Sequence, residues 1–189
     1  MQALFGMTEG VGGRAQLDGQ ALSFGKPAAA ISAGLAYVPE DRQQHGAHLT
    51  LPIRHNISLP ILSRIGFFLR GRSAAAETAL ARHYAQQLEL KAAHLDQAVS
   101  ELSGGNQQKV VLGKWLATQP KVIILDEPTK GIDIGAKAAV HRFVSELVTQ
   151  GLSVILVSSE LPEVLGLADR IVVMRHGRIR RVFDRAQAS

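Results

Sequence analysis

Residues 101–135, ELSGGNQQKVVLGKWLATQPKVIILDEPTKGIDIG, decide the fold class of this chain. Ser103 and two glycines stand before apolar residues at helical spacing, which predicts a capped helix whose N-terminus points outward. The run VIILD at 122–126 is apolar almost throughout, which is typical of a strand covered on both faces of a parallel sheet. This order of elements indicates an α/β fold.

The first turn of the predicted helix has the chemistry of an anion site. Free N–H groups and the helix dipole favour negative charge there, and the Ser103 hydroxyl adds a donor. Gly104 and Gly105 leave room for a ligand to approach the backbone. An ordinary capped helix after a glycine turn would explain SGG alone, but it explains the longer string LSGGNQQ less well.

Two carboxylates, Asp126 and Glu127, end the buried strand. Ligands of open α/β sheets gather at the carboxyl ends of strands, and adjacent strand residues alternate sides, so the two acids can have different roles. We expect Asp126 to hold Mg²⁺, directly or through water, and Glu127 to orient or deprotonate the water that attacks a γ-phosphate. The weaker alternative is a pair of acids that caps the turn before Pro128.

The N-terminal part of the chain predicts a hairpin, a short helix and a strand. Asp18-Gly19 lies between two short alternating runs within 14–24, which is a hairpin signal. Pro27 and Gly34 are placed to begin and end a helix, and Pro39 stops the strand LAYVPE.

The remaining segments predict a small helical lobe and then alternating helices and strands. We expect loop-like chain from 42 to 72, because Pro52 and Pro60 interrupt any long helix. An Ala-rich helix is expected over 74–91, with an apolar stripe formed by Leu80, Tyr84 and Leu88. The later elements are a helix over 135–149, the strand LSVILVS, a helix near 161–168 and the hairpin RIVVMRHGRIRRVF.

The composition excludes several kinds of site. The 189 residues include no cysteine, and the seven histidines show no metal-ligand spacing, so neither disulfides nor a thiolate metal site are expected. The apolar runs are too short to span a bilayer and the N-terminus lacks a signal-peptide pattern, so we expect a cytoplasmic chain. The net charge of +5 permits nucleic acid as a partner, but aromatic residues for base stacking are nearly absent beside the late arginines.

The sequence contains no phosphate-binding loop of the pattern G-x-x-x-x-G-K-[ST]. The two Gly-Lys pairs are Gly25-Lys26 and Gly113-Lys114, and the residues five positions before each glycine are Gln20 and Gln108. The usual device for holding nucleotide phosphates is therefore not found in these 189 residues.

The motifs together resemble those of ABC-type ATPases. LSGGNQQ resembles the signature motif, VIILDE the Walker B motif, and KGIDIG the D-loop centred on Asp133. YVPEDR and VSSELPEV resemble the second nucleotide-binding half of the double-length subunits that serve sugar importers. LPIRHNISLP and GKWLATQPKVIILDEPTKGID are most similar to rhamnose importers, with autoinducer-2, ribose and galactoside importers as relatives. The resemblance runs from about Leu4 to Phe183.

The resemblance implies an α/β fold, an incomplete P-loop NTPase core of the ABC ATPase type with a small helical subdomain. It implies one partial nucleotide-binding domain over 1–189, with a hairpin and Q-loop strand at 14–40, a helical subdomain at 41–101, and the signature, Walker B and switch core at 102–189. The central phosphate-loop strand, which in the family lies between SVILVS and RIVVM, is expected to be missing, which would leave apolar strand edges and a marginally soluble chain.

The resemblance also implies the site. Magnesium would be held by Asp126 and Glu40, and hydrolysis would involve Glu127 and Ser159. ATP would be contacted by Ser103, Gly104, Gly105, Asn106, Gln107 and Asp133. Glu40 stands where most members have glutamine, and Ser159 where most have a switch histidine. Since a hydroxyl cannot accept and return a proton near neutral pH as imidazole does, weak hydrolysis is expected in this half.

The resemblance finally implies partners. These are membrane permease subunits that dock near residues 40–72, another ABC ATPase half, and a periplasmic solute-binding protein, at the cytoplasmic face of the inner membrane and without nucleic acid. The chain would be a C-terminal piece, truncated after the phosphate loop and inactive alone. The alternatives are a non-catalytic remnant or partner-binding module, and a DNA-associated ABC protein, for which the helical lobe is too small.

Overall fold

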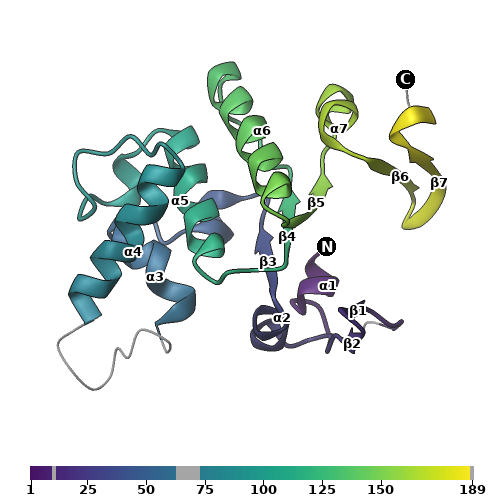
Figure 1. Ribbon diagram of the computed structural model, residues 1–189, viewed down its shortest axis with the longest axis horizontal. Coiled ribbons are helices and arrows are strands. Elements are labelled where there is room, and N and C mark those ends of the chain that lie inside the picture. Colours follow the sequence, from purple (N-terminus) through teal and green to yellow (C-terminus); the bar gives the residue numbers. More distant parts are fainter. Residues whose placement is uncertain (10–11, 63–72, 188–189) are drawn as a thin grey trace.

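The computed structural model describes residues 1–9, 12–62 and 73–187 (Figure 1). A parallel sheet at its centre has the order β3-β4-β5, formed by Leu35–Val38, Val122–Asp126 and Ser153–Val157. In register, Tyr37 pairs with Ile124, which pairs with Ile155. The α/β class with a parallel sheet, expected from the apolar strands, is confirmed.

Helices pack against the strands of this sheet. The helices that surround it are α1 Gln2–Phe5, α2 Pro27–Ala33, α5 Gly104–Leu116, α6 Ile134–Thr149 and α7 Leu161–Leu167. Helix α5 packs against β3, and α6 packs against β5. The buried side chains of α6 include Val140, Val144 and Leu147, whose spacing places them on one helix face.

Helices α3, Ile53–Ser58, and α4, Ser73–Gln87, form a lobe with α5 at one end of the molecule (Figure 1). Gly113 of α5 lies where these helices meet. A Cβ at this position would lie 3.2 Å from Leu88 Cδ1 and 3.5 Å from Ile57 Cδ1, so glycine permits the close approach. The expected helical lobe is present, and the internal boundaries at 41 and 102 stay a prediction.

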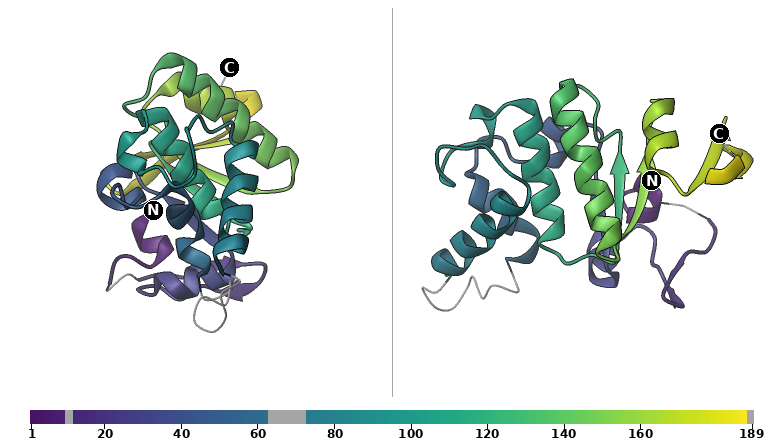
Figure 2. Two further views of the ribbon diagram at one scale, coloured as in Figure 1. Left: turned by 90° about the vertical axis from the view of Figure 1, so that its left-hand side faces the viewer. Right: turned by 45° about the horizontal axis from the view of Figure 1, so that its top comes forward.

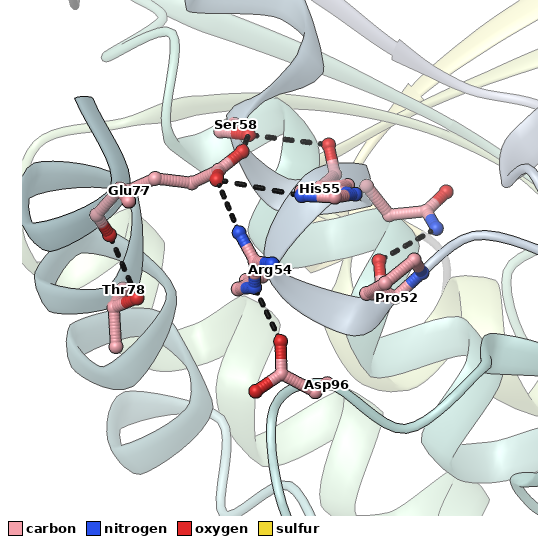
Figure 3. Close-up of polar contacts among 9 residues, drawn as sticks. Pro52, Arg54, His55, Ser58, Glu77, Thr78 and Asp96 are labelled. Carbon is pink, nitrogen blue, oxygen red and sulfur yellow. Dashed lines mark hydrogen bonds and ion pairs between the residues drawn. The ribbon is translucent and has the colours of Figure 1, made fainter. Parts of the chain in front are cut away.

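A buried carboxylate ties α3 to α4 (Figure 3). Glu77 of α4 accepts hydrogen bonds from Ser58 Oγ and from Arg54 Nη1, the latter at 2.7 Å. The Nε of Arg54 donates to Asp96 Oδ1 at 2.5 Å, and His55 Nε2 lies 3.6 Å from Glu77 Oε2. The guanidinium thus joins both helices of the lobe to the segment that leads into α5.

The expectation of loop-like chain from 42 to 72 is wrong for the part that the structure describes. Residues Arg42–Gly46 form a π-helical turn, α3 follows directly after Pro52, and Leu59–Ile61 form a 3₁₀ turn. Proline fits at a helix start, where its missing N–H would have no intrahelical partner, so Pro52 and Pro60 begin helical segments here. Residues 63–72 lie outside the described residues.

Other local predictions are confirmed within a few residues. Strands β1, Gln16–Leu17, and β2, Gln20–Ala21, form the hairpin, with both turn residues in the left-handed region. Helix α2 ends at Gly34, whose φ is 98°. Helix α4 ends at Gln87, four residues before the expected limit, so Leu88 lies just after it. Tyr84 and Leu88 are in the core, and Leu80 packs against it partly buried. The short turn Val99–Glu101 then leads into α5.

The last strands do not join the central sheet. Strands β6, Arg170–Arg175, and β7, Arg178–Asp184, form a separate antiparallel hairpin, followed by the 3₁₀ turn Arg185–Gln187. Figure 1 and the right view of Figure 2 show this hairpin at the end of the molecule opposite α3 and α4. Among the described residues, β5 pairs only with β4 and β6 pairs only with β7.

One face of the β6–β7 hairpin is apolar and exposed. Val172 pairs with Val182 and Met174 pairs with Ile179, and all four side chains are exposed.

Within the part of the chain that the structure describes, no helix is long and apolar enough to span a membrane.

Candidate functional site

The carboxyl ends of the three parallel strands bring the predicted acidic and hydroxyl side chains to one edge of the sheet. Glu40 follows β3, Asp126 ends β4 with Glu127 directly after it, and Ser159 follows β5. Because parallel strands run in the same direction, segments far apart in sequence meet at this edge. These four positions therefore lie at the same end of the parallel strands, and their roles in a site stay a prediction.

Asp126 is held by a tyrosine from the neighbouring strand. The hydroxyl of Tyr37 donates a hydrogen bond to Asp126 Oδ2 at 2.8 Å. Burial raises the pKa of Tyr37, and the hydrogen bond to Asp126 raises it further. The phenol therefore stays protonated and donates to the carboxylate, which itself remains partly exposed at the sheet edge.

Glu127 and Ser159, the two predicted catalytic residues, contact each other. Ser159 Oγ donates to Glu127 Oε2 at 3.2 Å. The backbone of Glu127 lies in the left-handed region with φ 48°, while its N–H donates to Val157 O at 2.8 Å. A non-glycine residue in this region is strained, which is common at functional sites. The strained turn directs the carboxylate toward the end of β5.

Glu40 forms an ion pair that the sequence did not suggest. Lys130 Nζ lies 2.6 Å from Glu40 Oε1, and both side chains are exposed. The hydrogen bond to Glu40, reinforced by its charge, raises the pKa of Lys130. No group of three or more His, Asp or Glu side chains is placed to hold a metal among residues 1–9, 12–62 and 73–187. The prediction that Asp126 and Glu40 hold Mg²⁺ stays a prediction.

Ser103 lies at the N-cap position of α5, as predicted, and it is exposed. Its hydroxyl makes no capping hydrogen bond, however, which corrects the expectation of a side-chain cap. Instead Ser103 Oγ accepts a hydrogen bond from Asn106 Nδ2 at 3.0 Å, and Asn106 Oδ1 accepts one from the Lys91 N–H at 3.0 Å. Asn106 thus connects the tip of α5 to the loop after α4.

Gly104 and Gly105 make room for other parts of this protein. A Cβ on Gly104 would lie 2.8 Å from Arg42 Nη2, and a Cβ on Gly105 would lie 2.9 Å from Ala136 Cβ. The expected approach of a ligand to the backbone of these glycines stays a prediction. A side chain added at either position would point at another part of this chain.

Gln107 points inward. Its side-chain amide donates to Val99 O at 3.3 Å and to Leu102 O at 3.1 Å, and the residue is buried. Helical periodicity places it on the same face as Val110 and Val111, which are also buried. This placement argues against the prediction of a direct ATP contact by Gln107, because its donors are used within the protein.

Asp133 lies at the N-terminus of α6, where its Oδ1 accepts a hydrogen bond from the Ala136 N–H at 2.9 Å. It is therefore a capping residue in this structure. Ile134, the next residue, is 86% exposed. A contact between Asp133 and nucleotide stays a prediction.

Three residues that contact the site were not given roles from the sequence. Tyr37 holds Asp126, Lys130 pairs with Glu40, and Arg42 contacts both the tip of α5 and the segment before α6. The string YVPEDR contains Tyr37 and Arg42, so the signal was present. This string gave a predicted role to Glu40 alone, because most ABC ATPases have glutamine at that position.

A family model described as ABC transporter matches residues 1–130. The chain belongs to the ABC transporter family. That assignment agrees with the sequence motifs and with the sheet edge at which they meet.

The ABC chain is also similar to curated proteins named for ribose import. It is 60% identical over 191 residues to "Ribose import ATP-binding protein RbsA" of Jannaschia sp. (strain CCS1), covering 100% of the chain and 36% of that protein. It is 48% identical over 191 residues to the RbsA of Rhodococcus jostii (strain RHA1), covering 100% of the chain and 37% of that protein. The chain thus spans little more than a third of the length of these relatives. Their names refer to ribose import rather than to rhamnose import.

Solved structures show the same fold. A nucleotide-free ATP-binding cassette from an ABC transporter matches with a TM-score of 0.79 and 22% identity, over 97% of this chain and 74% of that one. A dimeric post-hydrolysis state of the cassette MJ0796, bound to ADP and Pi, matches with a TM-score of 0.78 and 21% identity, over 97% and 78%. The ABC chain therefore has the fold of an ABC ATPase cassette.

Proposed function

We propose that this chain provides one side of a composite ATP site in a carbohydrate-type ABC importer. The observation that carries the proposal is the tip of α5, where Ser103 is exposed at the N-cap of a 13-residue helix and its hydroxyl makes no capping hydrogen bond. Such a tip favours a phosphate group. Nucleotide bound by another ABC half would present its terminal phosphate to this tip, and the Ser103 hydroxyl would donate to it.

The sheet edge would serve a second nucleotide position. Mg²⁺ would neutralise phosphate charge there, with Asp126 and Glu40 as ligands alongside water and phosphate oxygens, a donor set that suits this ion. Tyr37 would keep the Asp126 carboxylate oriented. Glu127 would orient the attacking water, and the Ser159 hydroxyl would hold the Glu127 carboxylate in place. The 189 residues contain no G-x-x-x-x-G-K-[ST] loop, so we expect no ATP turnover by this chain alone.

The proposed partners follow from the relatives' names. Those proteins are named for ribose import, so we extend to this chain a role in carbohydrate uptake. The partners would be membrane permease subunits, a second ABC half and a periplasmic solute-binding protein, at the cytoplasmic face of the membrane. Among the described residues, the permease would dock on the π-helical turn and α3, which lie between residues 40 and 62.

The test mixes this chain with a separately produced ABC half that carries a G-x-x-x-x-G-K-[ST] loop, and measures ATP hydrolysis. Turnover is expected only in the mixture. Ser103→Ala should lower kcat in the mixture by ~100-fold, as expected for loss of one transition-state donor. The control is Ser100→Ala, since Ser100 is also exposed and lies just before the helix. Magnesium-dependent turnover by the chain alone, or an inert mixture, would contradict the proposal.

A second candidate is a partner-binding module without catalytic action. The exposed Ile134 beside Asp133 favours it, because a large apolar side chain next to the site is suited to a protein interface. The same mixture separates the two. If the halves associate, but Ser103→Ala leaves turnover unchanged, the chain acts as a binding module.

A further inference from the structure

Arg42 connects segments that lie far apart in the sequence. It begins the π-helical turn after β3, where its Nη1 donates to Lys130 O at 3.0 Å and its Nη2 donates to Gly131 O at 3.2 Å. Lys130 and Gly131 lie directly before Asp133 and α6. One guanidinium thus holds two consecutive carbonyl groups of the segment 130–133.

The same guanidinium lies against the tip of α5. A Cβ on Gly104 would approach Arg42 Nη2 to 2.8 Å. The next glycine of the tip, Gly105, lies against Ala136, whose N–H is bound by the Asp133 side chain. Gly104 therefore packs against Arg42, and Gly105 packs against the first turn of α6.

The turn that carries Arg42 is itself fixed to α5. Lys114 Nζ donates to Gly46 O at 2.9 Å, and a Cβ on Gly46 would lie 3.0 Å from Val111 Cγ2. Asp41 accepts hydrogen bonds from the N–H groups of Gln43 and Gln44 and so closes the start of the turn. The base of the Arg42 side chain is thereby held on α5, while its far end holds the segment before α6.

We propose that Arg42 is a positioning residue that fixes the tip of α5 relative to the segment 130–133, and that position 104 is glycine because of Arg42. The planar fork of arginine can donate to two carbonyl groups at once, whereas lysine is a single point of charge. The Nε of Arg42 is buried without a partner among the described residues. A buried donor without a partner costs stability. The stabilising contribution of Arg42 therefore comes from the hydrogen bonds that its Nη1 and Nη2 donate.

This inference predicts a specific pattern of coupling. Alanine at Gly104 would push the flexible end of Arg42 away from Lys130 and Gly131, so Gly104→Ala should have the same effect as Arg42→Ala. The two changes together should then cost no more than either alone. Gly105→Ala acts against Ala136 instead, so its effect should add to that of Arg42→Ala. Gly166 of α7 has nothing within 4 Å of its Cβ direction, which makes Gly166→Ala the matched control.

The first measurement is hydrogen exchange of residues 130–136 in the complete chain. Arg42→Ala and Arg42→Lys should both speed exchange there, and Gly166→Ala should not. Adding Gly104→Ala to Arg42→Ala should change the exchange rates by less than about twofold, within the usual error of additivity. Full protection in Arg42→Lys, or equal effects of Gly104→Ala with and without Arg42, would overturn the proposal.

The second measurement uses the mixture with the loop-bearing ABC half and rests on the proposed function. Arg42→Ala and Arg42→Lys should lower kcat by ~100-fold, because small misplacements of a reacting group have effects of this size. The KM for ATP should change less than kcat, since the other half would hold the nucleotide. An inert wild-type mixture would refute the proposed function, while the exchange experiment would still decide the role of Arg42. If the mixture is active and Arg42→Lys leaves kcat unchanged, the role of Arg42 is refuted but the proposed function is not.

Discussion

Strand β4 and strand β6 have similar apolar sequences and opposite surroundings. Ile123, Ile124 and Leu125 of β4 are each 0% exposed, whereas Val172 and Met174 of β6 are 45% and 58% exposed. Strand β4 has a partner on both sides, and β6 is paired only with β7 among the described residues. Apolar residues stabilise a strand by burial, so they contribute most where neighbouring elements cover them. Substitutions in the central sheet, which α5 and α6 pack against, should therefore change the free energy of unfolding more than substitutions in the β6–β7 hairpin.

The largest difference is expected for deletions of apolar side chains. Ile124→Ala should reduce the free energy of unfolding by ~4 kcal/mol, because it removes buried surface and leaves a cavity. Val172→Ala should change it by less than ~0.5 kcal/mol, since the side chain is already exposed. Urea unfolding of the chain measures both. A large loss for Val172→Ala would show that the hairpin face is covered in solution.

Charged groups should sharpen the same contrast. Glu77→Ala should cost ~2 kcal/mol, because it removes the buried charged acceptor of the Ser58 Oγ and Arg54 Nη1 hydrogen bonds in the α3–α4 lobe. Asp169→Asn should have no measurable effect, since the Asp169–Arg185 pair is exposed and its closest distance is 4.0 Å. Thermal unfolding of the two variants gives the comparison. Equal melting temperatures would mean that the lobe opens before the rest of the chain.

Hydrogen exchange tests the edge of the central sheet. We expect residues 154–158 of β5 and the turn after it to exchange faster than residues 122–126 of β4, because β5 is paired on one side only among the described residues. An exposed apolar edge also promotes association, so the chain should be marginally soluble. Strong protection of 154–158 would mean that another strand or another molecule covers this edge.

The smallest effect is expected at acid pH. The hydrogen bond from Arg54 lowers the pKa of Asp96. A carboxylate with a lowered folded pKa adds stability above its unfolded pKa of about 3.9, and this contribution is lost as the pH falls through the folded value. Asp96→Asn should therefore flatten the dependence of stability on pH below about pH 4. A slope identical to that of the wild type would show that the Arg54–Asp96 contact is not maintained in solution.

Local patterns predicted much of the fold. The Asp18-Gly19 hairpin, the helix between Pro27 and Gly34 and the apolar strand at 122–126 follow from turn chemistry and hydrophobic periodicity, and all three are present. The segment 42–62 was misjudged because proline has two opposite meanings, as a breaker inside a helix and as a starter at its first turn. The sequence alone did not show which applied at Pro52.

The candidate site divides in the same way. The sequence located the exposed N-cap at Ser103 and the acidic pair at Asp126 and Glu127, because helix capping and strand ends have local signatures. It missed the inward direction of Gln107, since both faces of a first helical turn can be polar. It also missed Arg42, because the partners of that side chain lie 88 and 89 positions away.

The sequence by itself determined the Asp-Gly hairpin, the helix tip at Ser103 and the acids at the end of β4, since each depends on residues within one or two turns of each other. Tertiary structure alone decided that Tyr37 holds Asp126, that Lys130 pairs with Glu40, and that Arg42 lies beside Gly104. These contacts join positions about 60 to 90 residues apart. They arise from the parallel pairing of β3 with β4 and from the packing of α5, and no local pattern specifies either.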